Sequence, residues 1–474
     1  MNSRRRLLLI VLLIGFNLAV YYYLVKWFLR HRAGEIPKVP AVLVVSTCSL
    51  QTRLLKQYGL EGEIVLPNLE RFFKDSTYVF QNAFNPTPWT NLQDFIPAAI
   101  RGKELVELGY RPLNIWPADF FTTRIPLRRS VIKPEEKFFI NSLFEKQYRY
   151  YYDLTREMIT YPDPRPFFIA AHLKYMHFPL IDVFNPDSEW DFYLNADERE
   201  LVREYTTHPE RYPEKLPLLM MLTLNPNIAL THPKVKKWIP RPSPADRVKV
   251  SGLVTNAELL KDWESSPSFK QDLELFKKVY RGNARYLDRL LGPMLNLYGN
   301  KNLQRNTIVV FVGDHGEAHM DHGLLTHGQS VYDQELRVPM AIRIPGRVGE
   351  RIVVNESIHH GVVARLLGRI LRRTAHLDDL KKDLKELHDD YVIARDCANT
   401  VRGLRYQNKY KYFVRVADGE RFLFDLEKDP EERRNLAAAR PDLIEEFEAR
   451  YWENYPRFST LPRGYCPPWP NVSE

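Results

Sequence analysis

Two residues that can hold a metal ion follow an apolar run at positions 308–312. Asp314 and His315 come directly after Gly313. A carboxylate and an imidazole at the carboxyl end of a buried parallel strand lie where open α/β sheets place their ligands. Together they could hold a divalent metal that polarises a phosphoryl or sulfuryl oxygen. Further ligand or oxyanion-contact capacity comes from His319, His322 and His327. The alternative is a strand end with a capping aspartate and solvated histidines.

Polar side chains also follow two other apolar runs. The run at 41–45 leads into Cys48, and the run at 166–171 leads into His172–His177, which holds two histidines and a lysine. Because parallel strands end at one edge of a sheet, we expect these groups to face the crevice that holds Asp314. A single histidine there is usually structural, but two with a lysine favour contact with phosphate or sulfate.

A threonine follows a turn that two prolines make rigid. The turn is Asn85–Thr90, and a helix is predicted from Thr90 to about Ile100. A hydroxyl at this position is either the N-cap of the helix or a nucleophile, and the local sequence leaves both open.

Most of the chain has the pattern of an α/β domain. Apolar runs predict strands, and three- and four-residue spacing predicts helices, among them a long one at 260–297 that leads into the strand beginning at Thr307. From about 390 the pattern changes to alternating segments at 401–416 and 420–426, a hairpin signal. Shorter predicted elements are strands at 77–83 and 337–344, helical segments at 51–58, 66–73, 329–335 and 358–371, and a last helix at 441–453.

Two segments have no clear period. Residues 103–165 are aromatic and basic, and residues 182–248 are rich in proline, aspartate and tyrosine. We interpret the second as an insertion over the site that sets specificity.

The amino terminus has the pattern of a membrane anchor. Leu7–Val25 is uncharged and long enough to span a bilayer, follows Arg4–Arg6, and no signal-peptidase site comes after it. We expect a single-pass protein with a cytoplasmic amino terminus and its bulk on the extracytoplasmic side, although Lys26, Arg30 and Arg32 favour the opposite orientation. A buried core helix is the alternative. The predicted units are 1–29 (stub and anchor), 30–39 (linker), 40–389 (catalytic domain) and 390–474 (C-terminal subdomain).

Composition excludes some classes of function. The 474 residues are 44% hydrophobic, and 68 Lys+Arg against 59 Asp+Glu give a net charge of +9. The basic residues form no stripe with interleaved aromatics, so a nucleic-acid partner is not predicted; a membrane or an anionic substrate suits the charge better. The three cysteines form no CxxC pattern. Cys397 and Cys466 could bridge in an oxidising compartment, or stay unpaired thiols.

Several stretches, taken in order, resemble the sulfatase branch of the alkaline phosphatase superfamily over most of residues 40–455. They are Val42–Gly59, Leu66–Phe84, Pro88–Thr90, Phe167–Pro179, Arg285–Glu317, Thr326–Gly346 and Leu404–Ala437. The resemblance implies a mostly parallel central sheet flanked by helices, with a small C-terminal antiparallel sheet plus helix.

The resemblance also implies a metal-dependent enzyme acting on phosphate or sulfate esters, and roles for particular residues. Asp314 and His315 match metal ligands, and Thr90 matches the nucleophile, which also approaches the metal. The groups that contact the anionic substrate or leaving group are matched by His172, His177 and His327.

Three departures from the family pattern modify this expectation. Thr90 stands where sulfatases carry the cysteine or serine that becomes formylglycine, and residues 90–94 (TNLQD) lack the maturation signature, so no formylglycine is expected. Family members with threonine here are typically phosphotransferases of envelope lipids or polymers. Cys48 replaces an aspartate ligand; a thiolate would favour zinc, or manganese, over calcium or magnesium, whereas an uncharged thiol would leave an impaired site. Gln93-Asp94 replaces a small and basic pair.

The sequence therefore predicts a membrane-anchored hydrolase or phosphotransferase with one divalent metal ion, acting on phosphate or sulfate esters of the cell envelope. Two alternatives stay open. One is a catalytically impaired member of the family that serves as a binding module, and the other is a sulfatase with an unusual nucleophile. The sequence leaves protein partners open.

Overall fold

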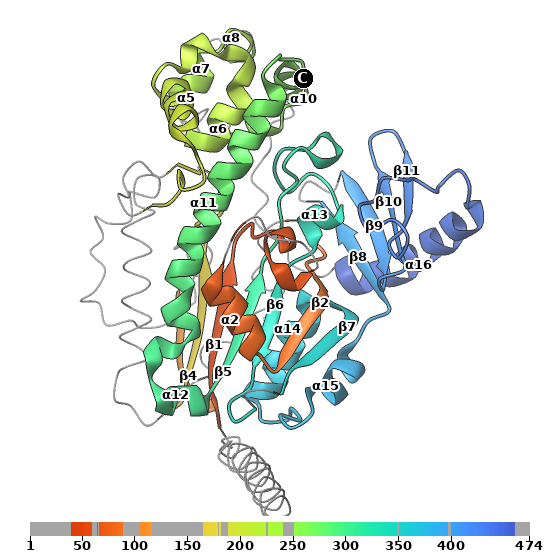
Figure 1. The fold of residues 1–474 in the computed structure, drawn as a ribbon. Helices are drawn as coiled ribbons and strands as arrows, with labels where there is room; N and C mark the ends of the chain where they lie inside the picture. The colour runs from red at the N-terminus through yellow and green to blue at the C-terminus, as the bar shows by residue number, and fades with distance from the viewer. Residues whose placement is uncertain are drawn as a thin grey trace, which may run out of the picture.

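A mixed sheet of seven strands forms the centre of the computed structural model (Figure 1). The structure describes residues 39–58, 64, 66–88, 105, 107–115, 165–178, 180–181, 188–223, 226–239, 251–347, 350–396 and 400–459. The strand order is β3-β4-β1-β5-β6-β2-β7. In chain order the strands are β1 (Ala41–Thr47), β2 (Tyr78–Phe84), β3 (Arg111–Ile115), β4 (Phe167–Leu173), β5 (Thr307–Gly313), β6 (Met340–Arg343) and β7 (Ile352–His359).

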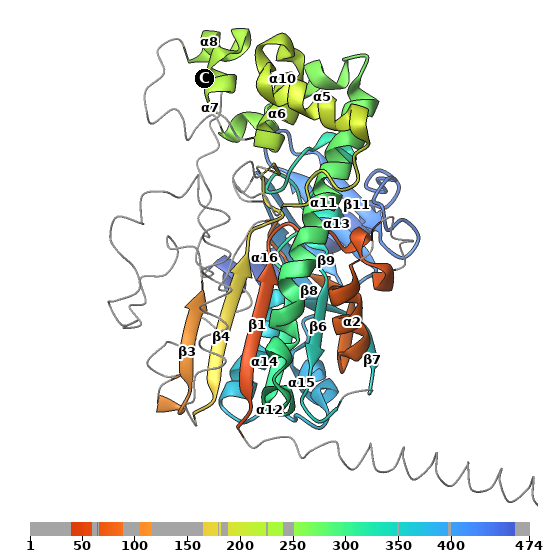
Figure 2. The same ribbon diagram turned by 60° about the vertical axis from the view of Figure 1, so that its left-hand side comes forward.

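The three central strands run parallel and end together. β1 pairs in parallel with β4 and β5, so that Thr47 lies opposite both Leu173 and Gly313. β6 is antiparallel to both its neighbours, β5 and β2, and β2 is parallel to β7. Figure 2 shows the arrowheads of β1, β3 and β4 at one end of the sheet and β6 pointing the other way. The predicted mostly parallel sheet is confirmed.

Helices cover both faces of the sheet, which explains the unbroken apolar runs. Val309 and Phe311 of β5 pack in one core with α2 (Pro67–Asp75) and α11 (Phe269–Leu295). The alternate residues Ile308, Val310 and Val312 pack in a second core with α14 (His360–Leu371) and α15 (Leu380–Leu387). Successive side chains of a strand point to opposite faces, so a doubly covered strand has no polar face.

The segment interpreted as an aperiodic insertion contains helices, which is a correction. It holds α5 (Ala196–Thr207), α6 (Leu216–Thr223), α7 (Pro226–Thr231) and α8 (Pro233–Trp238). Together with α10 (Ala257–Glu264), which follows the segment, these helices gather around the first part of α11 (Figure 1). In α6 every residue but Thr223 is buried. A helix buried on all sides has no amphipathic period, so its sequence pattern could not reveal it.

The C-terminal part is a four-stranded antiparallel sheet with one helix. The order is β11-β10-β9-β8, with β8 at Tyr391–Arg395, β9 at Val401–Tyr406, β10 at Tyr410–Arg415 and β11 at Arg421–Asp425; α16 spans Pro441–Ser459. The predicted hairpin around 418–419 is confirmed as β10–β11. The segment 401–416 is two strands rather than one. The unit boundary at 390 stays a prediction.

Other expectations need correction or fall outside the described residues. β3 and β7 were missed, and the predicted helix at 358–371 begins at His360. The segment 51–58 forms two 3₁₀ turns, Thr52–Leu54 and Lys56–Tyr58. The remaining elements are α12 (Lys301–Asn306), α13 (Asp333–Leu336) and short 3₁₀ turns at Pro209–Arg211, Pro213–Lys215, Ser251–Thr255, Leu297–Gly299 and Asp321–Gly323.

The predicted anchor at 7–25 and Cys397 and Cys466 lie outside the described residues. Within the described part of the chain, no helix combines the length and the apolar character that crossing a bilayer requires.

A buried ionic network joins the C-terminal sheet to α13. Lys411 of β10 is fully buried and its Nζ lies 2.5 Å from Asp333 Oδ1 and 2.7 Å from Glu432 Oε1. Burial alone would raise the pKa of Asp333, but Arg405 and Lys411 hold it below its usual value.

Removal of the lysine charge tests this network. Lys411→Met is expected to lower the free energy of unfolding by about 3–5 kcal/mol, because it leaves buried carboxylates without their counter-charge. Urea unfolding of the two proteins would measure the change. Lys409→Met, in the exposed turn between β9 and β10, is the matched control and should change little. An equal loss of stability in both variants would contradict the assigned role of Lys411.

Candidate functional site

The carboxyl ends of β1, β4 and β5 bring the predicted site residues together. Cys48 follows β1, His172 lies near the end of β4, and Asp314 and His315 follow β5. Backbone hydrogen bonds continue past the strands: Cys48 N donates to Leu173 O at 2.8 Å, and Asp314 N donates to Thr47 O at 2.9 Å. The three strand ends are therefore fixed relative to one another before any ligand binds.

The carboxylate of Asp314 has one oriented oxygen and one facing the imidazoles. Oδ1 accepts from the backbone N–H of Ser49 at 3.0 Å and of His315 at 2.6 Å. Oδ2 lies 3.5 Å from His315 Nε2 and 3.6 Å from His172 Nε2. Asp314 and His315 have no solvent exposure.

Cys48, Asp314 and His315 form a set of donors that fits a divalent metal. One ligand atom from each lies within 4.8 Å of the others. His315 Nδ1 donates to Gly316 O at 2.8 Å, which leaves Nε2, 3.6 Å from Cys48 Sγ, as its ligand atom. Sulfur, carboxylate oxygen and imidazole nitrogen are ligands that zinc accepts.

The Cys48 side chain is a neutral thiol when no cation is near. Burial, followed by the charge of Asp314, raises the pKa of this thiol well above its usual value. A thiol in that state can donate weakly to His315 Nε2, whereas a bound divalent cation would favour the thiolate.

A second set of donors includes a residue that the sequence reasoning missed. Glu317 is 2% exposed, and its Oε1 lies 2.6 Å from His327 Nδ1. Together with His315, whose ring centroid is 3.9 Å from that of His327, these residues also place ligand atoms within 4.8 Å. Burial raises the pKa of Glu317 to about 7. The local sequence around Glu317 does not distinguish a buried glutamate from a solvated one in a loop, so only the fold shows that Glu317 belongs to the site.

The remaining histidines of the site are neutral. His172 Nδ1 is 2.6 Å from Ser46 Oγ, and His177 Nδ1 donates to Phe178 O at 2.6 Å. Burial lowers the pKa of His172 and of His177 to about 3, and that of His327 to about 4. The His177 and His327 rings meet edge to face, with centroids 5.4 Å apart.

A positive charge stands close to these imidazoles. Lys174 opposes protonation of His172, His177 and His327. Neutral rings beside a lysine suit an anionic group, because the rings can hydrogen-bond it and the lysine offsets its charge.

Two histidines of the same stretch are directed at aromatic side chains instead, which corrects the expectation that they add ligand capacity. His319 packs edge-on against Tyr280, with ring centroids 4.3 Å apart. His322 stacks on Tyr332 at 3.7 Å. Both residues have positive φ, 49° and 53°.

The segment that leads to Thr90 is tied to the site. Asn85 Nδ2 donates to Asp314 O at 2.7 Å, and Asn85 Oδ1 accepts from the N–H of Thr87 at 3.1 Å. Pro88 is the last described residue here, and Thr90 and Gln93-Asp94 lie outside the described residues.

Comparison with protein families gives a match to the family model described as Sulfatase, over residues 89–370. A Delta 4,5-hexuronate-2-O-sulfatase from Bacteroides thetaiotaomicron is 32% identical over 152 residues, which cover 28% of this chain and 31% of that protein. An arylsulfatase from Clostridium perfringens is 29% identical over 224 residues, 41% of this chain and 45% of that protein. The chain thus spans less than half the length of the curated relatives it matches.

Solved structures share the fold at low identity. The structure of a putative sulfatase from Bacteroides thetaiotaomicron superposes with a TM-score of 0.59 at 16% identity, covering 89% of this chain and 93% of that chain. Phosphonate monoester hydrolase of Agrobacterium radiobacter superposes with a TM-score of 0.52 at 16% identity, covering 89% and 95%. The resemblance noted in the sequence is confirmed.

Proposed function

Because the chain belongs to the sulfatase family, we propose that it is a metal-dependent hydrolase or phosphotransferase acting on phosphate esters of the cell envelope. The observation that carries this proposal is the convergence of Cys48, Asp314 and His315 in one buried set of donors. We place the catalytic part on the extracytoplasmic side of a membrane, held by the predicted anchor at 7–25.

The donor set suits one divalent ion. Cys48 Sγ, Asp314 Oδ2 and His315 Nε2 would hold it, with Thr90 as the ligand that also reacts. A divalent ion there supplies charge stabilisation to a phosphoryl oxygen and lowers the pKa of a coordinated hydroxyl. The sulfur ligand favours zinc, or manganese, over calcium and magnesium.

The chain's own residues account for the remaining steps. The Thr90 hydroxyl loses its proton to solvent and attacks phosphorus: the bond from its oxygen to phosphorus forms as the ester bond to the leaving oxygen breaks. A water molecule or an acceptor hydroxyl then attacks the phosphothreonine and releases Thr90. His177 and Lys174 contact the phosphoryl oxygens. His172, whose Nε2 lies 3.6 Å from Asp314 Oδ2, holds that carboxylate in position.

Glu317 sets the role of His327. When the buried Glu317 is protonated it donates to His327 Nδ1, and the ring then presents Nε2–H as a donor to an anionic or leaving oxygen. When Glu317 is ionised, Nδ1–H donates to it and Nε2 becomes an acceptor. The pair can therefore hold one proton and deliver it to the leaving group.

A panel of esters tests the proposed reaction. The full chain in detergent is expected to release p-nitrophenol from the phosphate monoester or the phosphodiester with Zn²⁺ or Mn²⁺, and to lose the activity on chelation. Release from the sulfate ester alone would instead indicate a sulfatase with an unusual nucleophile. No turnover together with no stoichiometric metal would indicate a binding module, which the raised pKa of Cys48 favours as the second candidate.

Cys48→Asp tests the sulfur ligand directly. Replacing sulfur by carboxylate oxygen is expected to shift the ratio of the zinc and magnesium activation constants at least about tenfold toward magnesium. The constants come from metal titrations of turnover, with Cys48→Ala as the variant that offers no donor. An unchanged ratio in Cys48→Asp would mean that residue 48 does not contact the ion.

A further inference from the structure

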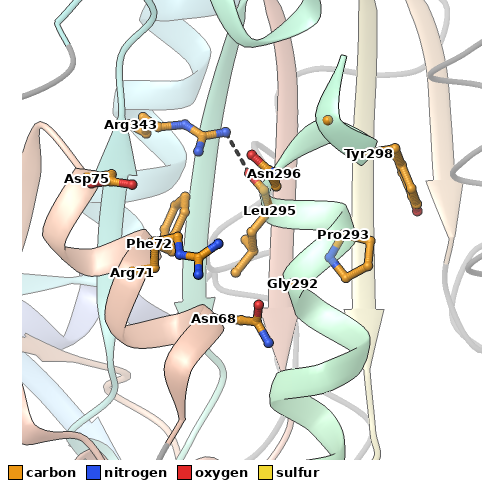
Figure 3. A pocket seen from close by; sticks show the side chains of 11 residues that line it. Asn68, Arg71, Phe72, Asp75, Gly292, Pro293, Leu295, Asn296, Tyr298 and Arg343 are labelled. Atoms are coloured by element: carbon orange, nitrogen blue, oxygen red, sulfur yellow. Dashed lines mark hydrogen bonds between the residues drawn. The ribbon is translucent and has the colours of Figure 1, made fainter. Parts of the chain in front are cut away.

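A cavity of about 560 Å³ lies between α2 and the C-terminal end of α11, at the opposite end of the sheet from the catalytic residues (Figure 3). Arg343, in its wall, pairs with Val309 in the sheet, five residues before Asp314. At about 3.3 Å per residue these positions are about 17 Å apart, so the cavity is separate from the site above. Its volume is in the usual range for small-molecule sites.

One end of the cavity is closed by tight helix packing. A Cβ at Gly292 of α11 would lie 2.5 Å from the side chain of Asn68. Asn68 Nδ2 donates to Asp288 Oδ2 at 2.9 Å, which fixes that side chain. The cavity therefore lies next to a close, hydrogen-bonded contact between the two helices.

Two guanidinium groups face this recess. Arg71 comes from α2 and Arg343 from the end of β6, and Figure 3 shows both directed toward α11. Arg343 Nη2 donates to Leu295 O at 2.6 Å, and its guanidinium lies 5.4 Å from the Phe72 ring centroid. Within the described residues neither guanidinium lies within 4.0 Å of a carboxylate oxygen.

The charge of the lining is not balanced. Arg71 and Arg343 against Asp75 leave one net positive charge (2 − 1 = +1). Burial lowers the pKa of Arg343 to about 10, and the carboxylate of Asp75 acts in the opposite direction. A half-buried guanidinium with unused N–H donors is stabilised by an anion that accepts them.

We propose that this recess, the α2–α11 pocket, binds the tetrahedral oxyanion of a phosphate or sulfate group, with Arg71 and Arg343 as its charged contacts. Such an anion matches the fork geometry of guanidinium donors. The group has two sources: a free anion, or an anionic lipid headgroup. The second is relevant because the recess lies toward the amino-terminal end of β1, the strand that follows the predicted anchor and linker in the chain.

The test uses the full chain in lipid nanodiscs of phosphatidylcholine, with inorganic phosphate and sulfate as probes in calorimetric titrations after chelation of metals. Arg71→Met and Arg343→Met are each expected to weaken the binding of phosphate and sulfate to the α2–α11 pocket at least about tenfold, because each variant loses a charge-assisted hydrogen bond. Arg71 is exposed, so its variant serves if Arg343→Met fails to fold. Arg305→Met on α12 removes a charge at the same end of the sheet and is the matched control.

Phosphatidic acid in the nanodiscs separates the two sources. If its phosphate headgroup fills the pocket, the binding of inorganic phosphate weakens in wild type but not in Arg71→Met; if the source is soluble, phosphate binds equally in both kinds of disc. Unchanged affinity in both arginine variants, or an equal loss in Arg305→Met, would overturn the proposal. Turnover by Arg71→Met should equal that of wild type, so this result is independent of the catalytic proposal.

Discussion

Thr90→Ala is expected to lower kcat/KM for the preferred phosphate ester by about 10⁴-fold, equivalent to about 5 kcal/mol of transition-state stabilisation. The reason is that the proposed covalent intermediate cannot form without the Thr90 hydroxyl. Initial rates with the p-nitrophenyl ester measure the loss. Mass spectrometry of the quenched reaction should find a phosphoryl adduct on Thr90 in wild type.

Two control variants separate a nucleophile from a helix cap. Thr90→Asn keeps an N-cap side chain, so a purely structural role predicts nearly full activity, whereas a nucleophilic role predicts the same loss as Thr90→Ala. Thr87→Ala removes the nearby hydroxyl that donates to Asn85 Oδ1 and should cost less than about tenfold. Equal activity of wild type and Thr90→Ala on every ester would exclude Thr90 as the nucleophile.

Asp314→Asn should abolish stoichiometric metal binding and reduce turnover by at least about 10³-fold, because the carboxylate is the charged hard donor of the proposed set. Its amide oxygen can still accept from the backbone N–H groups of Ser49 and His315, so the metal-free fold should persist. The measurements are metal content by mass spectrometry and the melting temperature with and without Zn²⁺. Wild type should be stabilised by saturating metal and Asp314→Asn should not.

Asp321→Asn is the matched control for this second experiment. Asp321 lies in the same loop but pairs with Arg53 at 2.5 Å and Arg433 at 3.4 Å, away from the donor set. Its variant should keep the metal-induced rise in melting temperature. Loss of that rise in Asp321→Asn, or its retention in Asp314→Asn, would contradict the assigned ligand.

The positions of the buried strands, and of the polar residues that follow them in the chain, could be predicted from the sequence. A strand covered on both faces must be apolar at each of its few positions, and such a run is visible locally. The runs at 41–45, 166–171 and 308–312 are apolar at every position, as two covered faces require. Parallel pairing of such strands then brings their carboxyl ends to one edge, where Cys48, His172 and Asp314 meet.

Elements whose burial depends on distant partners could not be predicted in the same way. α6 is buried on all sides by other helices, so its sequence carries no period. β7 has exposed and buried residues in no regular alternation, because it lies at the edge of the sheet. The antiparallel direction of β6 depends on the path of the chain between strands, which side-chain pattern does not record.

The sequence by itself determined the family, the mostly parallel sheet and the positions of the polar residues that follow its strands, because each depends on residues close together in the chain. Only the tertiary structure decided how the residues of the loop after β5 are directed. It placed Glu317 against His327 and turned His319 and His322 toward aromatic rings. It also opened the α2–α11 pocket between segments more than two hundred residues apart. Side-chain direction in a loop depends on backbone dihedral angles and on packing against distant residues, and the local sequence determines neither.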